Sequence, residues 1–323
     1  MSQFSSFHAL CVLEDKSLAQ SPSLSPLPRV VTKNSARISA SLCAVALGFS
    51  TFCLPAAQAA STYSQCDSAY FTAKTVAASA QLVNNSAFTR PTARFVADNW
   101  LNVALSCPSR FSEGIIRSAL ALHNSSLPSG EDSLQIVDNL AQITHSFETA
   151  DAFPMSSDAL QALAKSEDTI RFAYEVLATR DYTQSDLVDR AQYAAQSSEA
   201  FSTGARKATS GDFVDSRSRI YDASEIIRYS GTNQAVGIAM PLSASLELDA
   251  ALAELQAIQS DAQFQTDYHQ SSLNTSNAGN EETNSTDDAQ SDALVTYTAL
   301  LIREHLLRAL SLGAPGDMSL YMH

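Results

Sequence analysis

Hydrophobic residues recur at helical spacing through most of the chain after residue 60. Apolar positions separated by alternating steps of three and four lie on one face of an α-helix. This spacing predicts helices over residues 66–80, 91–107, 109–123, 132–147, 158–180, 183–207, 243–264 and 291–312. Residues 208–241 lack the pattern except for a short helix at 219–229, so we expect a long connection there. The predicted fold class is therefore all-α.

The first two predicted helices each carry one cysteine on the apolar stripe. The helix-breaking sequence NNSAFTRP lies midway between Cys66 and Cys107. An antiparallel hairpin folded at this breaker places the two cysteines opposite each other. We therefore predict a Cys66–Cys107 disulfide, which would stabilise the fold by roughly 3–4 kcal/mol in the chain-entropy model.

Residues 1–59 have the pattern of a secretory signal peptide. Arg29, Lys33 and Arg37 flank the apolar run ISASLCAVALGFSTFCL on its N-terminal side, and the small-residue sequence Ala57-Gln58-Ala59 follows it. This predicts cleavage after Ala59 and export to the cell envelope or the extracellular space. An uncleaved membrane anchor is the alternative, although the apolar run is short for a membrane span.

The charge balance restricts the partners. The 323 residues include 34 Asp and Glu against 20 Lys and Arg, a formal net charge of −14. Without residues 1–59, the balance is 32 acidic against 16 basic residues. Because an acidic surface repels nucleic acids and anionic lipids, we expect neither nucleic-acid binding nor membrane contact beyond a retained anchor. The expected partner is an unidentified protein or a small-molecule ligand.

The second half of the chain suggests a four-helix bundle. Four predicted helices of about 20 residues lie between 155 and 323, with a long crossover between the second and third. Residues 268–292, before the last helix, are polar and acidic, so we predict a disordered insert. The domain organisation expected after the leader is a disulfide-tied helical region at 60–150 and a four-helix bundle at 155–323.

Several sequence patterns in this half also suggest a family. They are EDTIRFAYEVLATR at 167–180, DRAQYAAQSSEAF in the next helix, a turn into Pro241 before SASLELDAALAEL, and a closing helix that runs into GAPG at 313–316. On these patterns, residues 158–315 resemble the ferritin-like domain of unknown function found in exported actinobacterial proteins. The resemblance implies a ferritin-like four-helix bundle with one long crossover and leaves the function open. The first 150 residues fall outside it.

Ferritin-like enzymes hold two metal ions with inward-facing Glu residues and Glu-x-x-His pairs. No Glu in this chain has a His three residues later. Ser198 and Ser202 occupy the inner stripe of the second bundle helix, where a metal ligand would be needed. We therefore expect no di-iron site, no bound metal and no cofactor.

Glu167 is the main candidate functional residue because it interrupts the apolar stripe of its helix, close to Tyr174 on the helical wheel. In the functional interpretation, it is a buried carboxylate with a raised pKa that faces a small pocket lined by Tyr174, Ser198 and Ser202. In the structural interpretation, it pairs with Arg171 or accepts a hydrogen bond from Ser198, and fixes the register of the bundle. The structural interpretation is preferred.

The other chemistry-bearing residues suggest no site. His305 lies opposite the apolar stripe of the last helix, beside Glu304 and Arg308, which predicts a surface position. The chain has no Gly-x-Ser-x-Gly, His-Glu-x-x-His, Cys-x-x-Cys or phosphate-binding glycine loop, and no residue is assigned as catalytic. These observations favour a non-catalytic binding or scaffolding protein over an enzyme. The alternative is an enzyme or metal-handling ferritin-like protein with a site around Glu167.

Overall fold

The structure is a computed structural model, and it describes residues 65–83, 90–124, 140, 143–144, 147, 153–180, 186–218, 220–221, 223–227, 232–266 and 285–321. The predicted leader at 1–59 and residues 268–284 of the predicted insert lie outside these described residues. Within them the fold is all-α, as predicted. Eight α-helices and two short 3₁₀ turns are present, and the β-pairing is an isolated bridge between Thr232 and Ala239.

The helices follow the predicted order closely. In chain order they are α1 (Gln65–Val83), α2 (Arg90–Ser106), η1 (Pro108–Arg110), α3 (Phe111–Asn124), α5 (Ser157–Arg180), α6 (Asp186–Ala208), α7 (Ala223–Ile227), α8 (Leu242–Ser260), α10 (Ser285–Ser311) and η2 (Met318–Leu320). Of the helix predicted at 132–147, the described residues 140, 143, 144 and 147 are helical.

The last long helix begins earlier than its apolar stripe indicates. α10 starts at Ser285, so residues 285–292 of the segment predicted to be disordered are helical. Residues 285–288, at the start of α10, are Ser, Thr, Asp and Asp. These residue types are favourable near a helix N-terminus, where side-chain oxygens and negative charges meet the free backbone N–H groups. At its other end, α10 stops before Gly313, whose φ of +110° suits a residue without a side chain.

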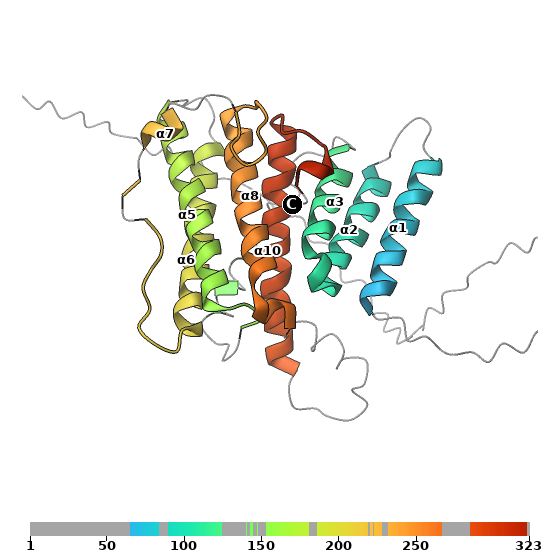
Figure 1. Cartoon of the computed structure of the whole chain (residues 1–323), viewed down its shortest axis with the longest axis horizontal. Coiled ribbons are helices and arrows are strands. Elements are labelled where there is room, and N and C mark those ends of the chain that lie inside the picture. Colours follow the sequence, from blue (N-terminus) through green and yellow to red (C-terminus); the bar gives the residue numbers. More distant parts are fainter. Residues whose placement is uncertain are drawn as a thin grey trace, which may run out of the picture. The chain divides into compact units, whose positions relative to one another are not determined.

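The long helices pack in a continuous series. α5 packs against α6 and α8, α8 against α10, α10 against α3, and α2 against both α3 and α1 (Figure 1). α6 also reaches α10, because the hydroxyl groups of Ser197 and Tyr297 are 2.6 Å apart. α5, α6, α8 and α10 thus share one interior.

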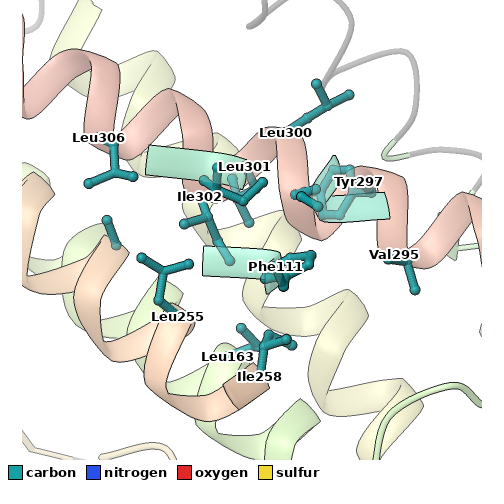
Figure 2. Packing of buried hydrophobic residues seen from close by; sticks show 14 of the residues in the cluster. Phe111, Leu163, Leu255, Ile258, Val295, Tyr297, Leu300, Leu301, Ile302 and Leu306 are labelled. Atoms are coloured by element: carbon teal, nitrogen blue, oxygen red, sulfur yellow. The ribbon is translucent and has the colours of Figure 1, made fainter. Parts of the chain in front are cut away.

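The main apolar core lies around α10 and includes residues of α3, α5 and α8. Its members include Phe111, Leu163, Leu255, Ile258 and Ile302, all buried (Figure 2). The core therefore continues across the domain boundary predicted near residue 150, and Ala60–His323 make up one compact unit.

Close packing requires a glycine at Gly114 on α3, where a Cβ atom would lie 2.6 Å from the backbone nitrogen of Ala104, and at Gly204 on α6. A Cβ atom at Gly204 on α6 would lie 2.1 Å from the ring of Phe147, well inside van der Waals contact. The missing side chain therefore lets Phe147 pack directly against the backbone of α6.

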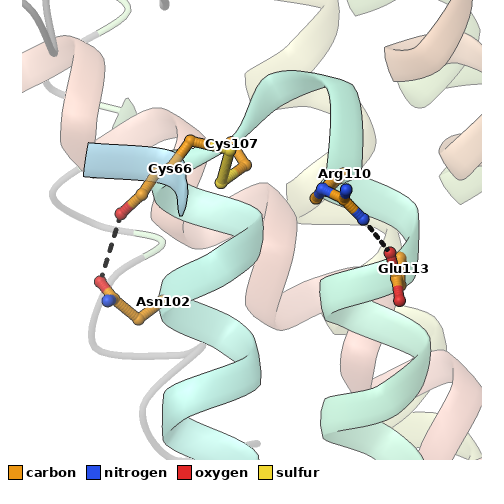
Figure 3. Close-up of a disulfide and its surroundings, with 6 residues drawn as sticks. Cys66, Asn102, Cys107, Arg110 and Glu113 are labelled. Atoms are coloured by element: carbon orange, nitrogen blue, oxygen red, sulfur yellow. Dashed lines mark hydrogen bonds and ion pairs between the residues drawn. A yellow bond between two sulfur atoms is a disulfide. The ribbon is translucent and has the colours of Figure 1, made fainter. Parts of the chain in front are cut away.

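The structure confirms the predicted cysteine pair. Cys66 at the start of α1 and Cys107 just after α2 are joined, with their Cα atoms 4.9 Å apart (Figure 3). Trp100 is buried beside them, and its ring meets that of Tyr70 edge-on at 5.8 Å between centroids. The antiparallel hairpin of α1 and α2 is thus fastened at its open end.

The long connection between α6 and α8 is attached to the helices by polar contacts. The hydroxyl of Tyr221 donates a hydrogen bond to Asp168 of α5, and the ring of Tyr221 stacks on Phe172. The buried amide of Asn233 donates to Ser245 Oγ at 2.6 Å and to Asp249 Oδ1 at 2.8 Å, both on α8.

None of the helices in the described part of the chain combines the length and the apolar character that a membrane span needs.

Candidate functional site

Buried charged side chains gather in the interior shared by α5, α8 and α10. They are Glu167 of α5, Glu247 and Glu254 of α8, and Glu304, His305 and Arg308 of α10. Glu247 and Glu254 are seven residues apart, so two helical turns bring both carboxylates to the same face of α8. Charged residues are rarely buried unless they are paired or bind a ligand.

His305 lies at the centre of this group. Its Nδ1 is 2.6 Å from Glu247 Oε2, and its Nε2 is 2.8 Å from Glu167 Oε1. The predicted surface position of His305 was wrong, because only 7% of the residue is exposed. The prediction assumed that α10 has one buried face, but α10 packs against α2, α3 and α8 and is covered on several sides.

Glu247 is held from three directions. Its Oε1 accepts hydrogen bonds from the hydroxyl of Tyr174 and from Nε of Arg308, while its Oε2 faces His305. Burial raises the pKa of Glu247 to about 7, against the opposing effect of His305. These contacts leave the carboxylate little freedom, so Glu247 fixes the orientation of the His305 ring.

Glu254 is fully buried and lies close to Glu167 and His305. It is 0% exposed, and neither of its carboxylate oxygens has a hydrogen-bonding partner among the described residues. Burial raises the pKa of Glu254 well above its ordinary value; the charge of His305 opposes this shift, and the charge of Glu167 adds to it. Carboxylate oxygens of Glu254 and Glu167 and a ring nitrogen of His305 lie within 4.8 Å of one another.

The site contains more acidic than basic groups. Four buried carboxyl groups, those of Glu167, Glu247, Glu254 and Glu304, share it with Arg308 and the His305 ring. Burial by itself would lower the pKa of His305, but Glu254 and Glu167 raise it well above the ordinary value. The group therefore needs added positive charge, which protons or a bound cation can supply.

A small cavity of about 60 Å³ adjoins this group. Residues of α5, α6, α8 and α10 line it, together with Leu140. The lining residues on α6 are Arg190, Tyr193, Ala194 and Ser197. Glu167 and His305 border the cavity, whereas Glu254 does not.

The structure brings only part of the predicted pocket together. Glu167 and Tyr174 lie at the site, although the Tyr174 hydroxyl bonds to Glu247 and not to Glu167. Ser198 and Ser202 are buried but do not line the cavity, and Ser198 Oγ donates to the carbonyl of Ala164 at 2.8 Å. Ser197, the neighbour of Ser198, lines the cavity in their place.

Glu167 also has a different partner from the one predicted. Arg171 pairs with Asp168 at 2.8 Å and with Glu175 at 2.6 Å, on the partly exposed side of α5. Glu167 instead faces His305, which is 138 residues away in sequence. Asp168 and Glu175 each lie within about one helical turn of Arg171. Arg171 therefore finds its partners on its own helix and does not enter the core.

Sequence reasoning missed Glu247, Glu254 and His305. The same signal that marked Glu167, a carboxylate within an apolar pattern, is present for Glu247 and Glu254. Both occur in the sequence SASLELDAALAEL. No local signal marks His305 as buried.

No family model matches the chain, and no curated protein or solved structure matches it either. Any functional proposal therefore rests on the side chains of the site themselves.

Proposed function

We propose that this protein binds one divalent transition-metal ion through Glu167, Glu254 and His305. The observation that carries the proposal is the convergence of one histidine nitrogen and two buried carboxylates at the centre of the site. His305 Nε2 and Glu167 Oε1 are 2.8 Å apart, and the unpartnered carboxylate of Glu254 lies beside them.

The contacts of Glu247 explain why this pair needs a cation. Because Tyr174 and Arg308 both donate to Glu247, that carboxylate is held as an acceptor for the Nδ1–H of His305. A neutral ring with its proton on Nδ1 has a lone pair on Nε2, which points at the carboxylate of Glu167. Two acceptors at this distance repel each other unless a proton or a metal ion lies between them.

The distance between His305 Nε2 and Glu167 Oε1 is compatible with two ligands of one metal ion, as it is with a direct hydrogen bond. Metal–nitrogen and metal–oxygen bonds of about 2.1 Å place neighbouring octahedral ligands about 3.0 Å apart. The 2.8 Å between His305 Nε2 and Glu167 Oε1 is close to this value. A carboxylate that orients the other nitrogen of a ligating histidine is the usual outer-shell arrangement in metalloproteins, and Glu247 is placed to serve in this way.

Glu254 completes the ligand set. A buried carboxylate with no hydrogen bond is costly, and coordination to a cation would satisfy it. Two carboxylates and one imidazole suit Mn²⁺, Fe²⁺ or Zn²⁺, and the excess of oxygen ligands favours Mn²⁺ or Fe²⁺.

The competing explanation uses protons alone. In that case, a protonated His305 lies between Glu167 and Glu247, and a protonated Glu254 carries no charge. Such a network would hold α5, α8 and α10 in register without any ligand. In this explanation Glu167 has a structural role, with His305 as its partner in place of Arg171.

We further propose that α5, α6, α8 and α10 form a ferritin-like four-helix bundle with a single metal site. The long connection between α6 and α8 supports this connectivity. The inner face of α6 supplies Ser197, Ser198 and Ser202 where a second metal ion would need carboxylate or imidazole ligands. The proposed function is therefore metal handling or metal-dependent chemistry at one ion.

The proposed place of action is outside the cytoplasm, in the cell envelope or the extracellular space. The signal-peptide pattern of residues 1–59 supports export, and the Cys66–Cys107 pair supports an oxidising environment. An unidentified protein or small-molecule partner remains part of the proposal.

Metal titration of the purified protein tests the proposal. We expect the metal-free protein to bind one equivalent of Mn²⁺, or of Fe²⁺ without oxygen. Glu254→Gln should weaken binding at least tenfold. Glu175→Gln is the matched control, because it is the same Glu-to-Gln substitution at an exposed position on α5. Absence of stoichiometric binding, or equal binding by the Glu254 variant, would support the proton-only network.

A further inference from the structure

We propose that the cavity beside His305 binds a small uncharged molecule at open coordination positions of the ion. This inference rests on the metal site proposed above and assigns that site an exogenous ligand. It follows from the place of the cavity, its size and the charges that line it.

The cavity shares two of its lining residues with the three proposed ligands. Glu167 and His305 belong to both the ligand group and the cavity wall, whereas Glu254 belongs only to the ligand group. An ion held by all three would therefore adjoin the cavity through Glu167 and His305. Mn²⁺ and Fe²⁺ prefer about six ligands, so three protein residues leave coordination positions open. Those positions face the cavity, as in catalytic metal sites and unlike closed structural ones.

The size of the cavity limits the ligand. A volume of about 60 Å³ has room for roughly two water molecules, because one water takes up about 30 Å³ in the liquid. Ala194, Leu140 and Leu301 form apolar parts of its wall. A molecule of a few non-hydrogen atoms fits, while a sugar, nucleotide or peptide does not.

The charges around the cavity disfavour an anionic ligand. Arg308 bonds to Glu247, and Arg190 Nε is 3.2 Å from Asp186 Oδ2, so both arginines have an anionic partner. The two carboxylate ligands balance the two charges of the ion. Glu304 adds a further carboxyl group to the wall and would repel an anion. An uncharged ligand is therefore favoured.

The cavity also has polar groups and an approach from the surface. The hydroxyls of Ser197 and Tyr297 form a hydrogen-bonded pair at 2.6 Å, and Ser197 lines the cavity. Tyr193, also in the lining, is 39% exposed, while Glu167, another lining residue, is 1% exposed. The lining thus extends from solvent to the proposed ion.

Nitric oxide, a neutral diatomic molecule, is a suitable probe because it binds Fe²⁺ and produces a characteristic half-integer-spin EPR signal. The full chain is loaded with Fe²⁺ without oxygen, bound iron is measured, and nitric oxide is titrated. We expect one nitrosyl signal for each bound iron. No bound iron would overturn both proposals, whereas bound iron without a nitrosyl signal would overturn the ligand proposal alone.

Two substitutions on α6 test whether the ligand enters through this cavity. Ala194→Leu adds three carbon atoms to the buried wall, and we expect at least a tenfold loss of nitric oxide affinity with stoichiometric iron retained. Gln196→Leu is the control, because Gln196 is exposed and does not line the cavity. Ala194→Val adds less volume and serves if the larger variant does not fold. Unchanged nitric oxide affinity in a folded, iron-loaded Ala194 variant would refute the assignment.

Discussion

Replacing Glu247 by Gln tests whether this residue positions His305 for metal binding. Glutamine has nearly the same shape as glutamate, but one of its two side-chain oxygens becomes an NH₂ group. In the protein, Glu247 Oε1 accepts from Tyr174 and Arg308, while Oε2 lies 2.6 Å from His305 Nδ1. All of these contacts need an acceptor on Glu247 when the ring proton is on Nδ1.

Glutamine satisfies only one side of this arrangement. If its oxygen faces Tyr174 and Arg308, its NH₂ group faces Nδ1, and the ring must move its proton to Nε2. That proton blocks the lone pair that would bind the metal ion. If the amide is turned around, the NH₂ group instead opposes two donors. Loss of such an outer-shell partner lowers metal affinity by about 10–100-fold, or about 1.4–2.7 kcal/mol.

The assay is a competition titration of Mn²⁺ into metal-free wild type, Glu247→Gln and the surface control Glu175→Gln. Thermal melting of the three metal-free proteins accompanies it. We expect weaker Mn²⁺ binding only for Glu247→Gln, with the metal-free variant still folded. Wild-type affinity combined with a lower melting temperature would show that Glu247 stabilises the core without positioning His305, and would refute the reasoning.

Three further predictions concern stability. Glu254→Met should raise the melting temperature of the metal-free protein while abolishing metal binding, because an apolar side chain replaces an unpartnered buried carboxylate; an unchanged or lower melting temperature would contradict this. Replacing Cys66 and Cys107 together by Ala should reduce the free energy of unfolding by roughly 3–4 kcal/mol in chemical denaturation, and two free thiols in the native protein would refute the pairing. Gly204→Ala should destabilise by about 1–3 kcal/mol, because its Cβ would lie 2.1 Å from the Phe147 ring; a melting curve like that of the wild type would be inconsistent with this contact.

The helices and the cysteine pair could be predicted from the sequence because local patterns determine them. The spacing of apolar residues places α5 and α6 within a few residues of their bounds, and the breaker between α1 and α2 sets the register that joins Cys66 to Cys107. Glu167 could be singled out for a similar reason, since a carboxylate in an apolar stripe is visible on a single helix.

The partners of Glu167 could not be predicted in this way. Its contact with His305 joins residues 138 positions apart, and it depends on how α5 and α10 are rotated toward each other. A helical wheel divides each helix into one buried and one exposed face, whereas α10 is covered on several sides. His305, Glu304 and Arg308 therefore read as a surface patch in the sequence, although all three are buried in the structure.

Anomalous X-ray diffraction from crystals grown with Mn²⁺ tests the central claim most directly, because it locates the ion. The account predicts one strong anomalous peak between Glu167, Glu254 and His305, with each ligand atom about 2.0–2.3 Å from the ion. The Nδ1 of His305 should remain beside Glu247. The claim would be contradicted by crystals that show no peak at this position while His305 Nε2 still lies in hydrogen-bonding contact with Glu167.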